Sequence, residues 1–146
     1  MNRLTQKQKG FTIVELLIVI VVIGILATIT TVAYNGIQAR ANDARRDSEI
    51  KHLKTALALY KSDTGFYPDA CGSGTGCNTS NLASALVPDY IEKIPQDPNP
   101  ATPYSYVRAT SSNDAYGIRV PYQAKPVCKT GVNIVPDWWG TATPVC

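Results

Sequence analysis

The sequence reads KGFTIVELLIVIVVIGILATITTVAYN from Lys9 to Asn35, and this stretch decides the fold. After Lys9, its one charged residue is Glu15. The other residues are apolar or small and polar, so a helix of this sequence is apolar on every face. At roughly 1.5 Å rise per residue, about 20 such residues cross the hydrocarbon core of a bilayer. The stretch therefore predicts a membrane-spanning helix.

Two ordinary explanations of this helix are incomplete. A secretory signal needs an apolar core of only about 7–15 residues before its cleavage site, and this run is longer. A plain single-pass anchor explains the length but gives Glu15 no purpose, because a carboxylate deep in a bilayer costs roughly 2.5–3.5 kcal/mol.

A motif at the head of the run supports a third interpretation. Gly10 is followed by Phe11, and Glu15 is the fifth residue after Gly10. This pattern resembles the cleavage and N-methylation motif of the type IV pilin and type II secretion pseudopilin family. The resemblance implies cleavage between Gly10 and Phe11 by a membrane-embedded aspartic prepilin peptidase, then methylation of the Phe11 amine. It divides the chain into a leader (1–10), a membrane-spanning or filament-core segment (11–35) and a globular domain (36–146).

The same resemblance implies a role in assembly for Glu15. Phe11 and Glu15 are four residues apart, so on a helix they share one face. A charge in apolar surroundings needs a partner. The Phe11 amine of an incoming subunit would supply that partner and set the axial register of a filament. The alternative is that Glu15 reaches the membrane interface and pairs with nothing.

The charge distribution indicates topology rather than a nucleic-acid partner. The net charge of +3 depends on Arg3, Lys7 and Lys9, which lie in the leader. Without them the chain has eleven basic and eleven acidic residues, so no nucleic-acid site is expected. Positive residues before the anchor keep the leader cytoplasmic. The part of the chain after the anchor is therefore exported.

The helical pattern continues beyond the membrane segment. Ile50, Leu53, Leu57 and Tyr60 repeat at spacings of three and four, which predicts an amphipathic helix with one buried stripe. Charged residues of both signs lie between them and are expected on the exposed side: Arg40, Asp43, Arg45, Arg46, Asp47, Glu49, Lys51, Lys54 and Lys61. No proline interrupts residues 11–64, so we expect one long helix that ends at Gly65.

The remainder of the chain predicts a small antiparallel sheet. Asn78 is a candidate N-cap for a short helix over residues 82–87. Alternating residues over 104–109 and 115–120 predict a hairpin, with a third strand near 131–135. The fold class is therefore α+β, with a long N-terminal helix, transmembrane in its first half, packed against a small antiparallel sheet as in pilins.

All four cysteines fall in the exported part, which predicts two disulfide bonds. Four cysteines allow three pairings, and local spacing favours Cys71 with Cys77 and Cys128 with Cys146. Closing the tail in this way resembles the C-terminal loop of many pilins. Trp138 and Trp139 lie inside that loop, and we expect at least one ring to pack beneath the tail.

One metal site is conceivable. Oxygen ligands in loops suit calcium, and the candidates are Asp97, Asn99 and Asp114. The segment DPNPATPY from Asp97 to Tyr104 resembles a segment of major pseudopilins, which bind calcium in this region. The alternative is that the two aspartates are turn residues, and no other cofactor is expected.

The sequence favours a structural protein over an enzyme, since no catalytic arrangement of residues is visible. The main prediction is a type IV pilus subunit that polymerises with copies of itself, anchored in the cell membrane before assembly and extracellular afterwards. Its partners would be the prepilin peptidase, an assembly platform protein and an ATPase. One alternative is a pseudopilin of a type II secretion system. A second is a membrane-anchored binding domain that does not polymerise.

We predict that the mature chain begins with N-methyl-Phe11 and that Gly10→Val blocks cleavage. A branched side chain at Gly10 would crowd the backbone that the peptidase must grip. Mass spectrometry of the membrane-extracted protein measures both results. An intact leader on the mature wild-type protein would contradict the prediction.

Overall fold

The structure, a computed structural model, describes residues 10–72 and 74–146. The leader predicted over residues 1–10 thus lies, except for Gly10, outside the described residues. The chain forms two compact units, Met1–Ile37 and Gln38–Cys146, and each is described by itself. Helix α1 (Ile13–Thr64) contributes to both units.

The described part of the first unit is helical from Ile13 onward. Its segment Ile13–Thr30 has a mean hydropathy of 2.9, and none of it is buried within the chain. This segment is long and apolar enough to cross a membrane. Because apolar side chains cover every face, the segment needs an apolar environment that the rest of the chain does not supply.

The end of α1 confirms the sequence-based boundary. Thr64 is the last helical residue, and Gly65 follows with φ 85°. The Gly65 N–H donates to the Lys61 carbonyl oxygen at 2.8 Å. Glycine adopts this left-handed conformation without the steric penalty of a Cβ, which is why the helix ends here.

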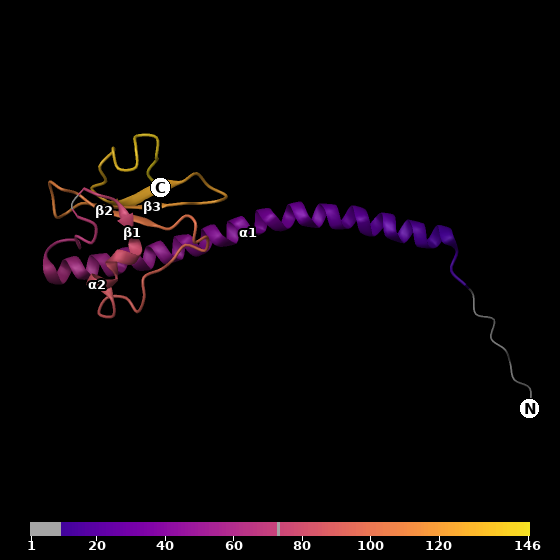
Figure 1. Cartoon of the computed structure of the whole chain (residues 1–146), viewed down its shortest axis with the longest axis horizontal. Helices are drawn as coiled ribbons and strands as arrows, with labels where there is room; N and C mark the ends of the chain where they lie inside the picture. The colour runs from indigo at the N-terminus through magenta and orange to yellow at the C-terminus, as the bar shows by residue number, and fades with distance from the viewer. Residues whose placement is uncertain (1–9, 73) are drawn as a thin grey trace, which may run out of the picture. The chain divides into compact units, whose positions relative to one another are not determined.

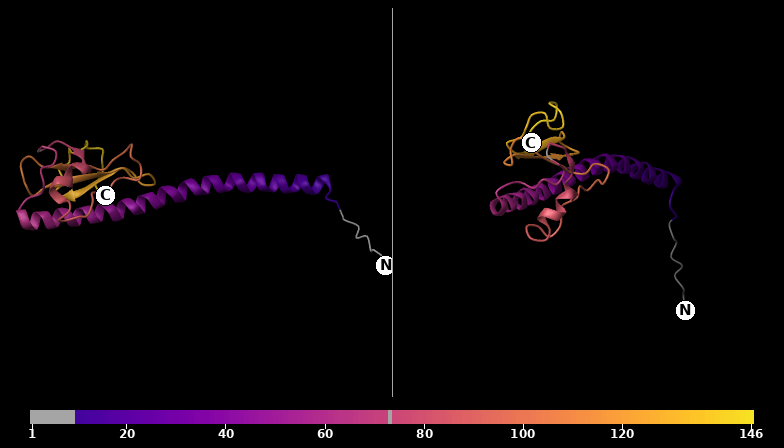
Figure 2. Two further views of the ribbon diagram at one scale, coloured as in Figure 1. Left: turned by 60° about the horizontal axis from the view of Figure 1, so that its bottom comes forward. Right: turned by 60° about the vertical axis from the view of Figure 1, so that its left-hand side comes forward.

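The second unit packs a four-stranded antiparallel sheet against the C-terminal part of α1 (Figures 1 and 2). The strands follow one another in the order β1 (Cys77–Asn78), β2 (Ser105–Arg108), β3 (Tyr116–Val120) and β4 (Cys128–Val132). The predicted α+β fold class is confirmed.

The core lies between α1 and the sheet. Leu53 and Leu57 of the helix are fully buried, as the apolar spacing predicted. They face a sheet surface that carries several tyrosine side chains, and the Tyr67 ring packs against that of Tyr116 in a tilted arrangement with 4.4 Å between ring centroids. On this surface, the side chains of β2 and β3 and of the residue before β2 are at most 2% exposed: Tyr104, Tyr106, Tyr116, Ile118 and Val120.

Two elements differ from the sequence-based expectation. The helix predicted over 82–87 is a 3-10 helix, η1 (Thr79–Leu82), followed by α2 (Ala83–Leu86). Asn78 is an N-cap, as predicted, but it caps the 3-10 helix η1: its side-chain oxygen accepts from the Ser80 N–H at 2.9 Å. The third strand begins earlier than expected, at Cys128, because β4 pairs with β3 over the whole length of β3.

Both tryptophans lie on the sheet face opposite α1. Val107, Gly117 and Gly131 are aligned across β2, β3 and β4 on that face. A Cβ added to Gly117 would lie 2.8 Å from Cε3 of Trp138 and 3.1 Å from Cζ3 of Trp139. The glycine therefore makes room for two rings that the tail lays across the sheet. The expectation that at least one ring packs beneath the tail is confirmed.

The C-terminal segment that carries these rings, after β4, is attached to β4 by a disulfide bond and by hydrogen bonds. A disulfide bond joins Cys128 of β4 to Cys146, and Cys71 is joined to Cys77 elsewhere in the unit. The ammonium of Lys129, a residue that is 3% exposed, donates to the carbonyl oxygens of Pro136 at 2.6 Å and Trp138 at 3.2 Å. Closing a loop of this size by a disulfide contributes roughly 3 kcal/mol in the chain-entropy model.

We predict that Gly117→Ala displaces the tryptophan rings. The added methyl group has no room, so the free energy of unfolding should fall by about 1–3 kcal/mol and the tryptophan emission should shift to the red. Gly36→Ala is the control, because a Cβ there meets nothing within 4 Å. Denaturant unfolding followed by fluorescence measures both, and an unchanged emission spectrum for Gly117→Ala would contradict the packing.

Candidate assembly site

The predicted cleavage site lies just ahead of α1. Gly10 and Phe11 precede the first helical residue, Ile13, and Phe11 is 91% exposed. A Cβ built on Gly10 would meet nothing within 4 Å. The Gly10–Phe11 peptide bond is therefore accessible and outside helical structure.

Thr12 and Glu15 form a capping box at the start of α1. The Glu15 N–H donates to Thr12 Oγ1 at 3.2 Å, and the Thr12 N–H donates to Glu15 Oε2 at 2.8 Å. The Thr12 hydroxyl also donates to Glu15 Oε2 at 2.8 Å. These reciprocal bonds satisfy N–H groups that a helix start leaves without partners.

This cap corrects one expectation. We expected a helix from Phe11, with Phe11 and Glu15 on one helical face, whereas the helix begins two residues later. The reason is that the Thr12 side chain occupies the N-cap position. The pattern T-x-x-E at 12–15 could have revealed this from the sequence alone.

The three candidate calcium ligands do not come together. Both carboxylate oxygens of Asp97 accept from Arg46, whereas Asp114 forms an ion pair with Lys61 at 2.7 Å. Arg46 and Lys61 are 15 residues apart on α1, which is roughly 22 Å along the helix axis. The Asn99 side-chain oxygen accepts from the Ala101 N–H. The described residues contain no group of three or more His, Cys, Asp or Glu side chains placed to hold a metal.

Arg46 is instead the centre of a buried ionic cluster. Its side chain is 0% exposed, and Nε and Nη2 donate to Asp97 at 2.6 and 2.7 Å in a two-point contact. Nη1 donates to Asp43 at 2.8 Å. Such forked contacts are among the strongest ionic hydrogen bonds in proteins. The hydrogen bond with Asp97, opposed by burial, raises the pKa of Arg46, so the guanidinium stays charged.

Asp43 is held by backbone as well as by Arg46. Its carboxylate accepts from the N–H groups of Gln123 at 2.9 Å, Ala124 at 2.8 Å and Lys125 at 3.2 Å. Burial by itself raises the pKa of Asp43, but the N–H donors and the guanidinium outweigh it and lower the pKa below its ordinary value. The cluster of Arg46, Asp43 and Asp97 thereby joins α1 to two loops, residues 95–103 and 121–125. We call this cluster the Arg46 clasp.

Two family models match consecutive parts of the chain. Residues 5–31 match a family model described as the prokaryotic N-terminal methylation motif. Residues 32–120, well over half of the chain, match the model for type II secretion system protein G. The chain belongs to the type II secretion system protein G family.

The similar proteins include several type II secretion system core proteins G and one fimbrial protein. The chain is 35% identical to type II secretion system core protein G of Escherichia coli over 66% of this chain and 70% of the relative. It is 33% identical to the type II secretion system core protein G of Aeromonas hydrophila over 64% of this chain and 68% of the relative. It is also 45% identical to fimbrial protein EcpC of Eikenella corrodens over 58% and 57%. No solved structure gives a significant match.

These findings correct the main functional prediction. The sequence favoured a type IV pilus subunit because a disulfide-closed tail resembles the C-terminal loop of many pilins, but the relatives with 31–35% identity are named core protein G, and the matching model is that of protein G. The prediction of a pilus subunit is therefore wrong. The motif is shared by pilins and pseudopilins, so it could not separate them.

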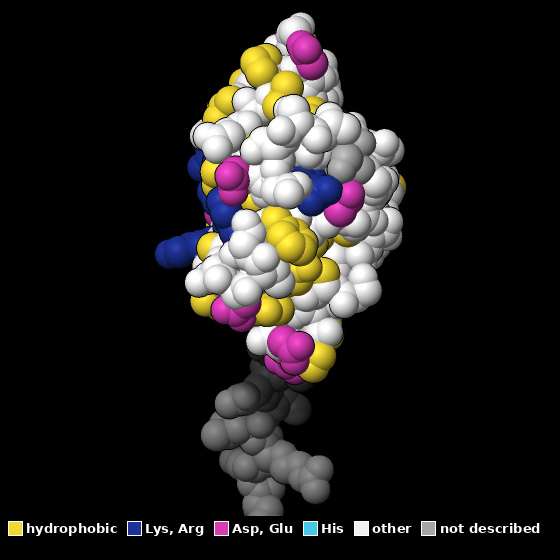
Figure 3. Space-filling view, turned by 90° about the vertical axis from the view of Figure 1, so that its left-hand side faces the viewer, with side chains coloured by type: hydrophobic (Ala, Val, Ile, Leu, Met, Phe, Trp, Pro, Cys, Tyr) yellow, Lys and Arg dark blue, Asp and Glu magenta, His cyan; other side chains and the backbone are white. Residues whose placement is uncertain are grey.

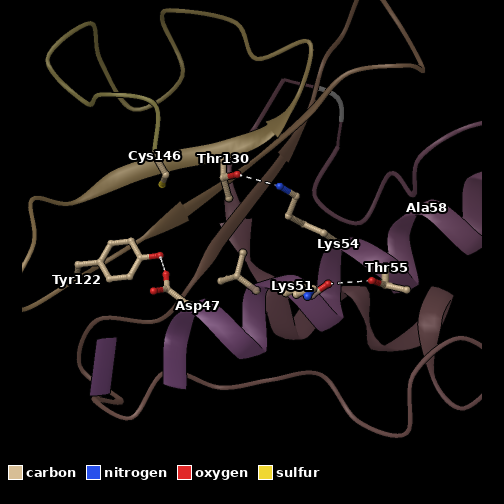
Figure 4. Close-up of a pocket in the computed structure, with 9 residues that line it drawn as sticks. Asp47, Lys51, Lys54, Thr55, Ala58, Tyr122, Thr130 and Cys146 are labelled. Carbon is tan, nitrogen blue, oxygen red and sulfur yellow. Dashed lines mark hydrogen bonds between the residues drawn. The ribbon is translucent and has the colours of Figure 1, made fainter. Parts of the chain in front are cut away.

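The protein G domain also has a groove of about 520 Å³ between α1 and β4 (Figure 4). Its polar side chains bond to one another: the Tyr122 hydroxyl donates to Asp47, and the Lys54 ammonium donates to Thr130. The first of these bonds lowers the pKa of Asp47. On the face shown in Figure 3, basic and acidic side chains are interspersed, so that face has no patch of a single sign.

Sequence reasoning missed Arg46 and Asp43 by assigning every charged residue of the helix to its exposed side. Arg46 lies four residues before Ile50 and seven before Leu53, on the apolar stripe itself. A charge at a stripe position predicts a buried ion pair, and that spacing was the available signal.

We predict that acid destabilises the domain through Asp43. Because its folded pKa is lowered, Asp43 contributes stability that is present above its unfolded value of 3.8 and is lost as pH falls further. Asp43→Asn should therefore lower stability at pH 7 and flatten its decline at lower pH. Urea unfolding at several pH values measures this, with the exposed Asp89→Asn as control. A decline as steep in Asp43→Asn as in the wild type would contradict the assignment.

Proposed function

We propose that this chain is a pseudopilin, a structural subunit of the filament of a type II secretion system. The observation that carries the proposal is the order of two matches along one chain. The methylation motif over residues 5–31 is followed without a gap by the protein G family over 32–120. A processed apolar helix that leads into this domain is the arrangement such a subunit needs.

The proposed pathway begins in the membrane. The apolar segment Ile13–Thr30 anchors the precursor with its C-terminal part exported, and a prepilin peptidase cleaves between Gly10 and Phe11 and methylates the new amine. The accessible peptide bond ahead of α1 supports this step. An assembly platform and an ATPase then move the subunit into a periplasmic filament.

Assembly uses the surface that the first unit leaves uncovered. In a filament, copies of the apolar segment pack against one another and replace the membrane as the apolar environment. The Glu15 carboxylate of one subunit then pairs with the Phe11 amine of its neighbour and sets the register. In the single chain, that carboxylate is held by Thr12 instead.

The proposed role is structural rather than enzymatic. The polar side chains that line the groove between α1 and β4 bond mainly to one another, which is typical of groups that stabilise a fold. The cysteines are joined in two disulfide bonds, and this supports a location outside the cytoplasm.

A deletion of the gene tests the proposal. A strain that lacks the protein should retain secreted enzymes in its periplasm, and expression of the wild-type chain should restore them to the medium. Normal secretion in the deletion strain, together with a loss of surface fibres, would contradict the proposed function.

We predict that the charge of Glu15, rather than its cap, is needed for assembly. Glutamine can replace glutamate in a capping box, so Glu15→Gln keeps the helix start but removes the charge. An unpaired buried ammonium costs roughly 3–5 kcal/mol, which is on the order of a hundredfold or more in each subunit addition. Overexpressed Glu15→Gln should be cleaved normally and yield few filaments.

The matched control is Thr12→Val, which removes the capping hydroxyl and keeps the carboxylate. Its filament yield, measured by shearing and immunoblotting, should stay much closer to that of the wild type. A normal yield from Glu15→Gln expressed alone would rule out pairing as the register mechanism.

A further inference from the structure

The Arg46 clasp occupies the region in which the family resemblance implies calcium. Asp97, the first candidate ligand, is 7% exposed, and its two oxygens already receive Nε and Nη2 of Arg46. Oxygen Oδ1 also accepts from the Asn99 N–H at 2.7 Å. Both oxygens of the carboxylate that would anchor a cation are thus already engaged by hydrogen-bond donors.

The remaining groups around the clasp have the wrong chemistry for a cation. Calcium takes six to eight oxygen ligands. The atoms that face Asp43 are three backbone N–H groups and Nη1 of Arg46. An N–H group cannot turn into an acceptor, so a cation at Asp43 would leave these buried donors without partners. The residues present therefore do not fit a calcium ion.

The charges of the cluster are also stabilised without metal. Two buried carboxylates face one buried guanidinium, and the excess negative charge on Asp43 is met by its three N–H donors. Backbone N–H groups that converge on a carboxylate stabilise its charged form. A divalent cation at these carboxylates would compete with the guanidinium and with N–H groups that already donate to all four of their oxygen atoms.

We propose that the guanidinium of Arg46 replaces a divalent cation: it links α1 to the loop 95–103 through Asp97, and it holds Asp43 of α1, whose carboxylate binds the loop 121–125. The link is covalently part of the helix, so the domain folds and keeps its stability without calcium. Arg46 suits this position because its planar fork contacts Asp97 at two points while a third nitrogen reaches Asp43, a geometry that lysine cannot reproduce.

The first test uses the wild-type full-length chain in detergent. Thermal unfolding is followed by tryptophan fluorescence, because both tryptophans lie in the second unit. The midpoint should agree within about 2 °C between excess calcium chloride and excess chelator. A resident cation at a hundredfold its dissociation constant would raise the midpoint of a domain of this size by roughly 10 °C or more.

The second test compares two neighbouring arginines. Arg46→Met leaves two buried carboxylates without their counter-charge and should lower the midpoint by roughly 10 °C or more. Arg45→Met removes the same charge from an exposed side chain, which is bonded only to Glu49 among the described ion pairs, and should change the midpoint by less than about 2 °C. Arg46→Lys should behave more like Arg46→Met than like the wild type.

The outcomes are decisive even if Arg46→Met does not fold. A fall of about 10 °C in the wild-type midpoint on chelation, or stoichiometric binding of radioactive calcium to the wild-type chain, would overturn the proposal. Equal midpoints for Arg46→Met and Arg45→Met would overturn it as well.

Discussion

The second unit depends on one buried charge. Arg46 has no contact with solvent, and a charge withdrawn from water is tolerated only when it is paired and fully hydrogen-bonded. Asp97, from the loop 95–103, and Asp43, on α1 itself, meet that demand. The guanidinium therefore constrains the loop 95–103 directly, and it constrains the loop 121–125 through Asp43, whose carboxylate accepts from three N–H groups of that loop. Removing either partner costs more than the intact pair contributes relative to apolar residues, because the other charge is left buried.

The two units of the chain differ in how the apolar surface of α1 is covered and in how the charged groups on α1 are paired. In the second unit, the apolar stripe of α1 is covered by the sheet, and the charge on that stripe is neutralised within the chain. Among the described residues of the first unit, the apolar segment Ile13–Thr30 is not buried, and the carboxylate of Glu15 accepts from Thr12 at the start of the helix. The proposed function accounts for the difference, since a subunit that assembled through its N-terminal helix would leave that part of its surface available.

The sequence predicted those parts of the structure that depend on local rules. Gly65 marked the end of α1 because a left-handed residue there favours glycine, and the spacing of Leu53 and Leu57 marked the buried stripe. The 3-10 helix η1 and the early start of β4 could not be predicted, since they depend on partners distant in sequence. Strand β1, only two residues long, exists because Cys77 and Asn78 pair with β2.

The functional residues also fall into two groups: those in a contiguous motif, which the sequence predicted, and those brought together from distant parts of the chain, which it did not. The cleavage and methylation motif is contiguous in sequence, so a single stretch predicted it, although the choice between pilus and pseudopilus required the comparison with relatives. The partners in the Arg46 clasp are 51 residues apart for Asp97 and about 80 for the N–H groups that hold Asp43. No local pattern joins them, and the charge of Arg46 on an apolar stripe was the sole indication.

Hydrogen–deuterium exchange of the wild type and Arg46→Met tests the central claim most directly. If the guanidinium holds the loop 95–103 directly and the loop 121–125 through Asp43, the amides of Asn99 and of Gln123, Ala124 and Lys125 should lose protection together in the variant. The amide of Ile118, in the middle of β3, should stay protected under conditions in which the variant remains folded. Loss of protection in one loop alone, or in neither, would contradict the claim that a single buried charge positions both.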